Sequence, residues 1–377
     1  MNKQLDILFL ITGNPLPAML DMAFFAQNSG QQVAMVLLQR GEMDLRIDSS
    51  LVNYEIFTID VTYKSTGIKR FTSIPTVYRK LRKLVKTKIK PDGVLFTASY
   101  DLLLFSYFIS GRDQYRIRHQ VRDLHSLQLT TSLISKFLVF IEGKLLRRVE
   151  SIIVSSPQFY NEYYKKIYKG KVILLENTPL KTTWTSFSKK EKDDIFNIGF
   201  VGIIRYKESL YQLVDAVEKS ALNGMNVNVL FAGGGDVVDL KTRISNPSLF
   251  EFQGAYEYSK DIKRLYSGLD LIYAVYDGND INCQLAMPNK FYESIISKIP
   301  IIVASGTFVG YEVERLGIGV SVKSGDTINL ERLLSELNNP NNWYEQALRN
   351  LHKIDPETYY VAYYEAIKNS VSSENNI

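Results

Sequence analysis

Two cations follow the end of a predicted strand in the second half of the chain. The strand ends at Val201, Gly202 comes next, and Arg205 and Lys207 lie in the short loop before a helix of apolar period. The N-terminus of a helix favours anions, so the loop and the helix together suit a diphosphate. Solvated loop cations would have the same sequence, and this loop alone leaves both interpretations open.

A second candidate group begins at Pro288. Proline is favoured at the start of a helix, which predicts that Asn289, Lys290 and Glu293 lie in the first turn of one. A carboxylate there can accept hydrogen bonds from two ribose hydroxyls, and a lysine can meet phosphate. The alternative is that Glu293 is only a favourable acid near a helix N-terminus.

Three consecutive glycines, Gly233 to Gly235, follow the next predicted strand. Glycines let the backbone pass close to a ligand or make a tight turn. The spacing is not G-x-G-x-x-G, and no acidic residue about 20 positions further on takes the ribose-binding role, so the dinucleotide fingerprint is absent. A turn into a helix is the simpler interpretation.

Short aliphatic runs alternate with segments of helical period along almost the whole chain. Strands are expected at residues 5–11, 32–38, 54–58, 93–96, 116–121, 151–154 and 172–175, and again at 197–201, 226–231, 250–253, 269–275, 299–304 and 317–322. In the first half, helices are expected near residues 18–28, 76–90, 100–109, 132–149 and 158–168. This alternation predicts parallel sheets covered by helices on both faces.

The fold class is therefore α/β, with two Rossmann-like parallel-sheet domains that face a cleft. The predicted domains are residues 1–180, residues 181–355, and a C-terminal helix within residues 356–377 that can return to the first domain. Open parallel sheets bind ligands beyond the carboxyl ends of their strands. We therefore expect the chemistry in the loops that follow the strands.

Composition excludes several classes of protein. The 377 residues include one cysteine, Cys283, and three histidines, which excludes a disulfide framework and argues against a dedicated metal centre. The charge is uneven, since residues 1–180 carry a net +10 and residues 181–377 a net −5. Ten lysines and arginines and no acid occupy residues 61–91, a pattern typical of a surface that meets anions.

No targeting or membrane-spanning segment is expected. Asp6 abuts the short apolar run at the N-terminus, and Asp101 interrupts the longest other apolar stretch, Val94 to Ile109, which is shorter than the roughly 20 residues that a bilayer requires. With one cysteine, the chain reads as cytoplasmic.

The order and spacing of the second-half segments resemble the donor domain of GT-B glycosyltransferases, most closely the large retaining group, family 4-like, of bacterial polysaccharide synthesis. The resemblance runs in register over about residues 195 to 322. It rests on Val201-Gly202 with Arg205 and Lys207, Phe231 to Asp236, Gly254-Ala255-Tyr256, Leu269 to Val275, and Pro288 to Glu293 followed by Ile299 to Ala304.

The resemblance implies an enzyme that moves a sugar from a nucleotide-sugar donor, with a UDP-sugar favoured, to a glycan or lipid-linked glycan. It assigns the donor diphosphate to Arg205 and Lys207 and the nucleotide ribose to Glu293. It implies no cofactor, and no D-x-D metal motif lies in a suitable loop, so we expect metal independence. The donor-binding residues that it implies are Gly13, Gly202, Gly234, Tyr256, Asn289, Lys290 and Glu293.

The sequence departs from the family at one position. The acidic pair of the family, separated by seven residues, would place an acid at position 285, where this chain has Leu285. Asp277 or Asp280 can substitute, or the sugar is recognised differently. The departure leaves retention or inversion at the anomeric carbon undecided.

The first half resembles the same enzymes more weakly. Gly13-Asn14-Pro15 follows the first strand as a glycine-bearing loop does in the family, and the segment Arg122-Asp123-Leu124-His125 follows the fifth strand. As catalytic candidates, Asp123 and His125 can hydrogen-bond the donor sugar or deprotonate an acceptor hydroxyl. The alternative is that Asp123 caps the next turn and His125 is a surface residue.

An amphipathic basic helix is predicted over Thr76 to Lys90. It is either a helix docked on the sheet with a solvated basic back or a helix that rests on anionic lipid, and we favour lipid because lipid-linked sugars are common acceptors for enzymes that resemble this one. Location would then be cytoplasmic and peripheral to the membrane. Two rivals stay open, a nucleotide-sugar epimerase of the same two-domain form and a non-catalytic anion-binding protein, whereas a nucleic-acid partner is not expected.

Overall fold

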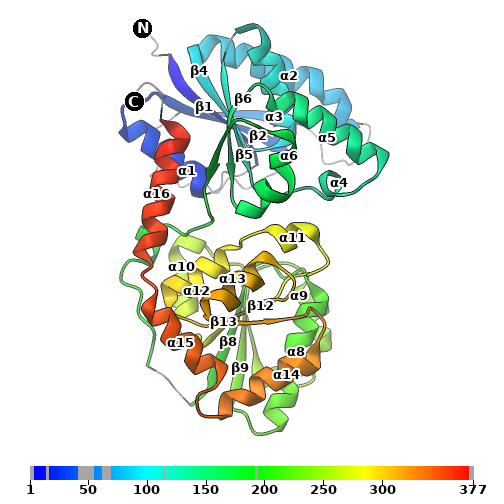
Figure 1. Ribbon diagram of the computed structural model, residues 1–377, viewed down its shortest axis with the longest axis vertical. Coiled ribbons are helices and arrows are strands. Elements are labelled where there is room, and N and C mark those ends of the chain that lie inside the picture. The colour runs from blue at the N-terminus through cyan, green and yellow to red at the C-terminus, as the bar shows by residue number, and fades with distance from the viewer. Residues whose placement is uncertain are drawn as a thin grey trace. The chain divides into compact units, whose positions relative to one another are not determined.

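The computed structural model describes residues 4–13, 17–40, 55–61, 69–113, 115–191 and 194–372. The chain forms two compact units, which are drawn in Figure 1. Unit 1 comprises Met1–Glu176 and Ala362–Ile377, and unit 2 comprises Asn177–Val361. Asn14 and Pro15 of the predicted glycine-bearing loop, Tyr54 of the third predicted strand and residues 62–68 of the basic segment lie outside the described residues.

Unit 1 is built on a seven-stranded sheet in the order β3-β2-β1-β4-β5-β6-β7, and every strand pairs in parallel with its neighbour. The hydrophobic runs explain the strands, because a parallel sheet is covered on both faces. The strands are β1 (Leu5–Thr12), β2 (Val33–Arg40), β3 (Glu55–Val61), β4 (Ile89–Thr97), β5 (Arg116–Val121), β6 (Val149–Val154) and β7 (Lys171–Leu174).

Helices cover both faces of this sheet (Figure 1). Ile7, Phe9 and Ile11 of β1 face α1 (Pro17–Asn28) and the C-terminal helix α16 (Glu357–Val371), whereas Leu8 and Leu10 face the other side. The helices and turns of the crossovers are α2 (Lys69–Lys88), α3 (Tyr100–Asp113), α4 (Ser126–Leu129), α5 (Leu133–Leu146), a π-helical turn η2 (Phe159–Tyr164) and α6 (Lys165–Ile167).

The apolar stripe of α2 is part of the core. Val77, Leu81 and Val85 are buried against the sheet, and Arg79, Lys80, Lys83 and Lys86 are exposed. The helix also begins earlier than predicted, at Lys69 rather than Thr76, contains Pro75, and ends at Lys88.

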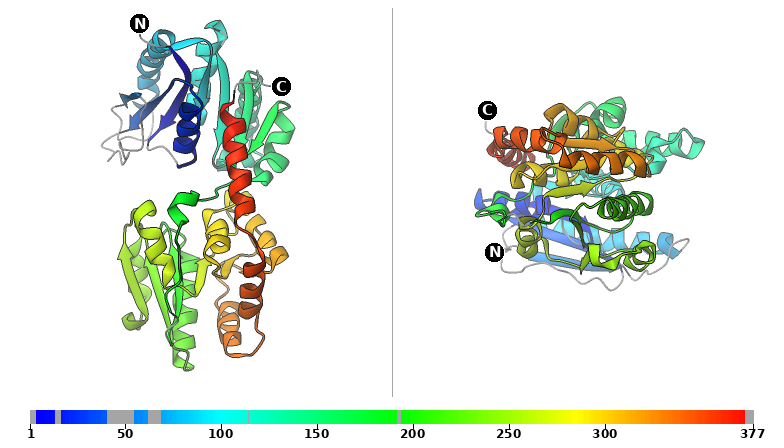
Figure 2. Two further views of the ribbon diagram at one scale, coloured as in Figure 1. Left: turned by 90° about the vertical axis from the view of Figure 1, so that its left-hand side faces the viewer. Right: turned by 90° about the horizontal axis from the view of Figure 1, so that it is seen from below.

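Helix α16 is continuous, as the left view of Figure 2 shows, yet its residues divide between the units at Val361 and Ala362. Within unit 1 it is held by Arg118, whose side chain is almost fully buried. The guanidinium donates to the backbone carbonyls of Ser370 (2.6 Å) and Ser372 (2.8 Å) and pairs with Glu150 at 3.0 Å. These bonds satisfy the charge of a buried arginine.

Unit 2 is built on a six-stranded parallel sheet in the order β10-β9-β8-β11-β12-β13. Two cores cover its faces, one under α8 and α14 and one under α10, α12, α13 and α15. The strands are β8 (Phe196–Val201), β9 (Val227–Ala232), β10 (Phe250–Gly254), β11 (Leu271–Ala274), β12 (Ile301–Ala304) and β13 (Gly319–Val322). The helices are α7 (Lys181–Trp184), α8 (Lys207–Leu222), α9 (Val237–Arg243), η3 (Pro247–Leu249), α10 (Tyr258–Ser267), α11 (Ile281–Leu285), α12 (Asn289–Ser297), α13 (Phe308–Leu316), α14 (Thr327–Ser335), η4 (Glu336–Asn338) and α15 (Trp343–Lys353).

Candidate functional site

The two cations of the first loop lie at the N-terminus of α8. Lys207 is the first residue of this helix, and Arg205 lies exposed two residues before it, with its guanidinium 4.7 Å from the centre of the Tyr206 ring. Lys207 Nζ lies 3.2 Å from Asp239 and 3.7 Å from Asp236. Among the described residues no carboxylate lies within ion-pair distance of Arg205, so Arg205 is the better placed of the two to meet an anion.

The glycine loop packs backbone against backbone on the loop after β8. A Cβ on Gly233 would lie 1.8 Å from the carbonyl oxygen of Gly202, and a Cβ on Gly235 would lie 2.2 Å from that of Ile204. Both glycines have positive φ, and the amide of Ile204 donates to the carbonyl of Gly234 at 2.8 Å. Gly233 and Gly235 are therefore required by the turn. Gly234 has open space at its Cβ position.

Glu293 lies one turn deeper than predicted. Helix α12 begins at Asn289, with Pro288 as its N-cap, and Glu293 is its fifth residue, so the carboxylate lies in the second turn of a helix with 3.6 residues per turn. The carboxylate is fully buried. Lys290 Nζ donates to it at 2.6 Å, the Tyr258 hydroxyl donates at 2.9 Å, and the Tyr266 hydroxyl donates as well.

The surroundings of Glu293 are rich in tyrosine. Burial and the nearby carboxylate raise the pKa of Tyr256 to about 12, and the same causes raise the pKa values of Tyr258 and Tyr266 further, so all three hydroxyls remain protonated donors at neutral pH. Lys290 is buried too, and its charge is matched by Glu293. A ribose that binds Glu293 must therefore displace one of the hydrogen bonds that Tyr258, Tyr266 and Lys290 donate to this carboxylate.

The remaining donor-side residues lie in the same set of loops. Asn289 is exposed at the first position of α12, and Met287, just before that helix, accepts a hydrogen bond of 2.8 Å from Asn177. The structure thus brings Gly202, Arg205 and Lys207 together with Gly234, and Tyr256 together with Lys290 and Glu293. Both groups follow strands of unit 2.

Leu285 ends the short helix α11, and the two acids proposed to replace its missing carboxylate have local roles. Asp280 is the N-cap of α11 and accepts from the amides of Asn282 (2.7 Å) and Cys283 (3.2 Å). Asp277 accepts from the amide of Asn279 at 2.9 Å. Each side chain therefore shapes the loop after β11.

Two tyrosines beside Arg205 were missed at the sequence level. The rings of Tyr206 and Tyr276 lie 5.2 Å apart, and the Tyr206 hydroxyl lies 3.4 Å from Cys283 Sγ. Burial raises the pKa of Cys283, so the thiol stays protonated at neutral pH. The sequence signal that could have indicated Tyr276 is its position directly after the apolar run that contains β11.

In unit 1, the predicted catalytic loop follows β5. Asp123 and His125 are exposed, and the backbone amide of His125 donates to Gln128 Oε1 at 2.6 Å. Gly13 follows β1 with φ of 79°, and its amide donates to the carbonyl of Leu38 at 3.1 Å. These residues lie at the carboxyl ends of the unit 1 strands, where parallel sheets place their ligands.

A buried carboxylate supports this loop, and no sequence pattern had indicated it. Glu142 of α5 is 1% exposed and accepts hydrogen bonds from the hydroxyls of the last two residues of the π-helical turn η2, Tyr163 and Tyr164, the latter at 3.0 Å. Gln128 Nε2 donates to both of its oxygens at 3.0 and 2.9 Å. Burial raises the pKa of Glu142. Gln128 thus links the backbone amide of His125 to the buried carboxylate of Glu142.

His119 is a buried residue of β5. It exchanges a hydrogen bond of 2.8 Å with Thr97, and burial lowers its pKa to about 4. The imidazole is therefore neutral at physiological pH and belongs to the core.

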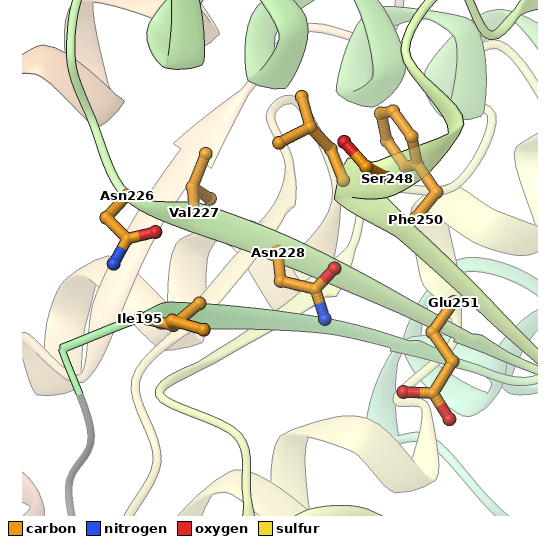
Figure 3. A pocket seen from close by; sticks show the side chains of 8 residues that line it. Ile195, Asn226, Val227, Asn228, Ser248, Phe250 and Glu251 are labelled. Atoms are coloured by element: carbon orange, nitrogen blue, oxygen red, sulfur yellow. The ribbon is translucent and has the colours of Figure 1, made fainter.

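One pocket of unit 2 lies away from these loops. It has a volume of about 400 Å³ and is lined at the starts of three neighbouring strands, as Figure 3 shows. Asn226 precedes β9, Ile195 precedes β8, and Phe250 begins β10. The amino ends of the strands are opposite the edge that carries Arg205 and Glu293, so this pocket is separate from the candidate site.

The described residues contain no group of three or more histidine, cysteine, aspartate or glutamate side chains that could hold a metal ion. No helix in the described ranges is long and apolar enough to cross a membrane.

Comparisons with known proteins show what this chain resembles. No family model matches the chain. The succinoglycan biosynthesis protein ExoL of Rhizobium meliloti is 21% identical over 373 residues, which cover 94% of this chain and 90% of ExoL. Anabaena HepE, solved in complex with UDP and glucose, superposes with a TM-score of 0.70 at 13% identity over 98% of this chain and 100% of HepE. Sucrose-phosphate synthase from Thermosynechococcus elongatus gives 0.68 at 14% identity, over 97% and 96% of the two chains.

The two parallel sheets and these superpositions define the class: the chain has the GT-B fold. The α/β fold class and the GT-B fold that the resemblance implied are confirmed.

Proposed function

We propose that the chain is a glycosyltransferase that moves a sugar from a nucleotide-sugar donor to a glycan or lipid-linked glycan during surface polysaccharide synthesis. The observation that carries the proposal is the position of Arg205 and Lys207 at the N-terminus of α8, at the carboxyl edge of a GT-B sheet. The relation to ExoL supports the polysaccharide role, and the UDP complex of HepE supports a UDP-sugar donor.

In this proposal unit 2 binds the donor and residues 1–180 serve the acceptor. The acceptor hydroxyl attacks the anomeric carbon, the bond between that carbon and the diphosphate oxygen breaks, and the nucleoside diphosphate leaves with the bonding electrons. Arg205 and Lys207 stabilise the negative charge that grows on the leaving group. Asp123 or His125 takes the proton of the acceptor hydroxyl.

Glu293 completes the donor site by binding the ribose, with Lys290 and Tyr256 beside it. Gly202 and Gly234 keep the backbone of the two phosphate-side loops open to a ligand, and Asn289 is exposed at the start of α12. Gly13 directly follows β1 of unit 1, as Gly202 directly follows β8 of unit 2. Because the two cations and the helix N-terminus supply the positive charge, we expect transfer to proceed in the presence of EDTA.

A thermal-shift panel of UDP-, GDP- and CMP-sugars tests the donor class, because a ligand that binds only the folded state raises the melting temperature. We expect a shift with UDP-sugars that Arg205→Ala abolishes. The matched control is Arg332→Ala, an exposed arginine of α14 that pairs with Glu336. No shift with any nucleotide sugar would contradict the proposal.

A nucleotide-sugar epimerase is the second candidate. A putative UDP-N-acetylglucosamine 2-epimerase from Listeria monocytogenes superposes with a TM-score of 0.65 at 10% identity. Incubation with a UDP-sugar and no acceptor distinguishes the two activities. An epimerase changes the configuration of the sugar under these conditions, whereas a glycosyltransferase transfers no sugar without an acceptor. A binding protein would show the thermal shift without turnover.

Membrane association is part of the proposal. The exposed cations of α2, among them Arg79, Lys80, Lys83 and Lys86, form a positively charged face that favours an anionic lipid surface. A lipid-linked acceptor would lie at such a surface.

A further inference from the structure

Helix α5 has an inverted distribution of polarity. Its apolar side chains Leu133, Ile134, Phe137 and Phe140 are 84%, 66%, 62% and 57% exposed. Their spacing places them on one side of the helix. Among the described helices, no other carries four exposed large apolar side chains.

The buried side of the same helix is partly polar. Ser135 is fully buried beside Ser132, and Glu142 is buried among Gln128, Tyr163 and Tyr164. Folding alone favours the opposite arrangement, in which apolar side chains are buried and carboxylates face water. An exposed apolar cluster of this kind marks a surface that meets a partner.

The exposed charges of α5 and of the two residues that follow it are all positive. Lys136, Lys144, Arg147 and Arg148 are exposed, and the one acid of α5 is the buried Glu142. Lys144 Nζ lies 4.4 Å from the centre of the Phe140 ring. Aromatic and aliphatic groups flanked by cations suit the headgroup region of an anionic bilayer, where the rings enter the acyl boundary and the amines meet phosphate.

The neighbouring helix α3 extends the face. Phe108 is 56% exposed, and its ring meets Tyr107 edge to face. The Arg148 guanidinium lies 4.3 Å from the Tyr107 ring centre, which joins α3 to the end of α5. Helices α2, α3 and α5 cover the same face of the unit 1 sheet (Figure 1).

We propose that α5 is the element that docks the protein on an anionic phospholipid bilayer, with Leu133, Ile134, Phe137 and Phe140 inserted at the interface. Helix α2 then contributes charge, because its own apolar stripe is buried in the core. The inference rests on the proposed function, because a lipid-linked acceptor lies in the membrane that the enzyme would bind. A symmetric contact between two α5 helices would set rows of cations against each other, which disfavours a second copy as the occupant.

The test is sedimentation of the full chain with vesicles of phosphatidylcholine and phosphatidylglycerol, and with phosphatidylcholine alone. We expect binding to the anionic vesicles, and a drop of at least about tenfold in the partition coefficient for Phe137→Ser with Phe140→Ser. The matched control is Leu222→Ser with Val238→Ser, which removes two exposed apolar side chains of unit 2 and should bind as the native protein does.

A second variant reports insertion directly. Phe137→Trp should show a blue-shifted fluorescence maximum with anionic vesicles and none with the zwitterionic ones. Absence of native binding at low salt, or native-like binding of the double serine variant, would overturn the proposal. A dimer that the double serine variant converts to monomer would overturn it in favour of a second copy. Vesicle binding without sugar transfer would refute the proposed function and leave the docking inference intact.

Discussion

Tyr363 of α16 donates a hydrogen bond of 2.6 Å to the Asp21 carboxylate of α1, across 342 residues of sequence. Burial of Asp21 raises its pKa to about 6, despite the opposing effect of this hydrogen bond. The contact that fixes the end of the chain in unit 1 therefore includes a carboxyl group that folding prefers to keep protonated.

This pKa predicts a pH dependence. Because the folded-state pKa is raised above the ordinary value of 3.8, the stabilising contribution is complete below about pH 4 and is lost as the pH rises through about 6. Asp21→Asn keeps an acceptor for Tyr363 and removes the charge. We expect it to be more stable than the native protein near neutral pH, by at most about 3 kcal/mol, and equal to it near pH 4. Urea denaturation at both pH values measures the difference in the free energy of unfolding between the variant and the native protein. An equal difference at both pH values would refute the assignment to Asp21.

Glu293→Ala should destabilise unit 2 by about 3–5 kcal/mol, because it leaves the buried charge of Lys290 without a partner. The double variant Glu293→Gln with Lys290→Met removes both charges and should recover most of that loss. Calorimetry on this folded double variant then tests the ribose contact, for which we expect at least about tenfold weaker donor binding. Unchanged donor affinity would show that Glu293 is a structural carboxylate.

Arg205→Ala should lower kcat by about 100-fold or more, since negative charge grows on the diphosphate only as the bond breaks. Lys207→Ala should have the smaller effect, because Asp239 and Asp236 already balance that charge. Arg243→Ala, which removes an exposed partner of Asp215, is the control. Steady-state kinetics decide, and a change confined to KM would mean that donor and transition state are bound equally.

Gln128→Ala should lower kcat while donor affinity in unit 2 stays constant, because Gln128 holds the amide of His125 and the carboxylate of Glu142 in place. Gln128→Glu is a sharper probe, since it sets a second carboxylate against Glu142, and its activity should recover as the pH falls. Identical pH profiles for the native and glutamate proteins would show that the loop needs no such support.

The sequence predicted the positions of the unit 2 strands along the chain, because buried parallel strands are continuous apolar runs, as in β8 and β12. The helical turn of Glu293 was predicted wrongly, because the five residues from Asn289 to Glu293 exceed the 3.6 residues of one turn. Burial of Glu293 and Glu142 was not predictable, since the tyrosines that satisfy each carboxylate are brought to it by tertiary packing. The same holds for α5, whose apolar period reads as a core face until its buried side is seen to carry Ser135 and Glu142.

The path of the chain through α16 has a consequence for synthesis. Unit 1 contains residues on both sides of Asn177–Val361, and its core needs Tyr363, Ala366 and Ile367 to cover one face of the sheet. On the ribosome, its strands emerge long before that cover exists, so the later unit is free to fold first. Helix α1 covers part of the apolar face of β1, and the part that Tyr363, Ala366 and Ile367 cover stays exposed until α16 is translated, a stage at which chaperone binding and aggregation compete with folding.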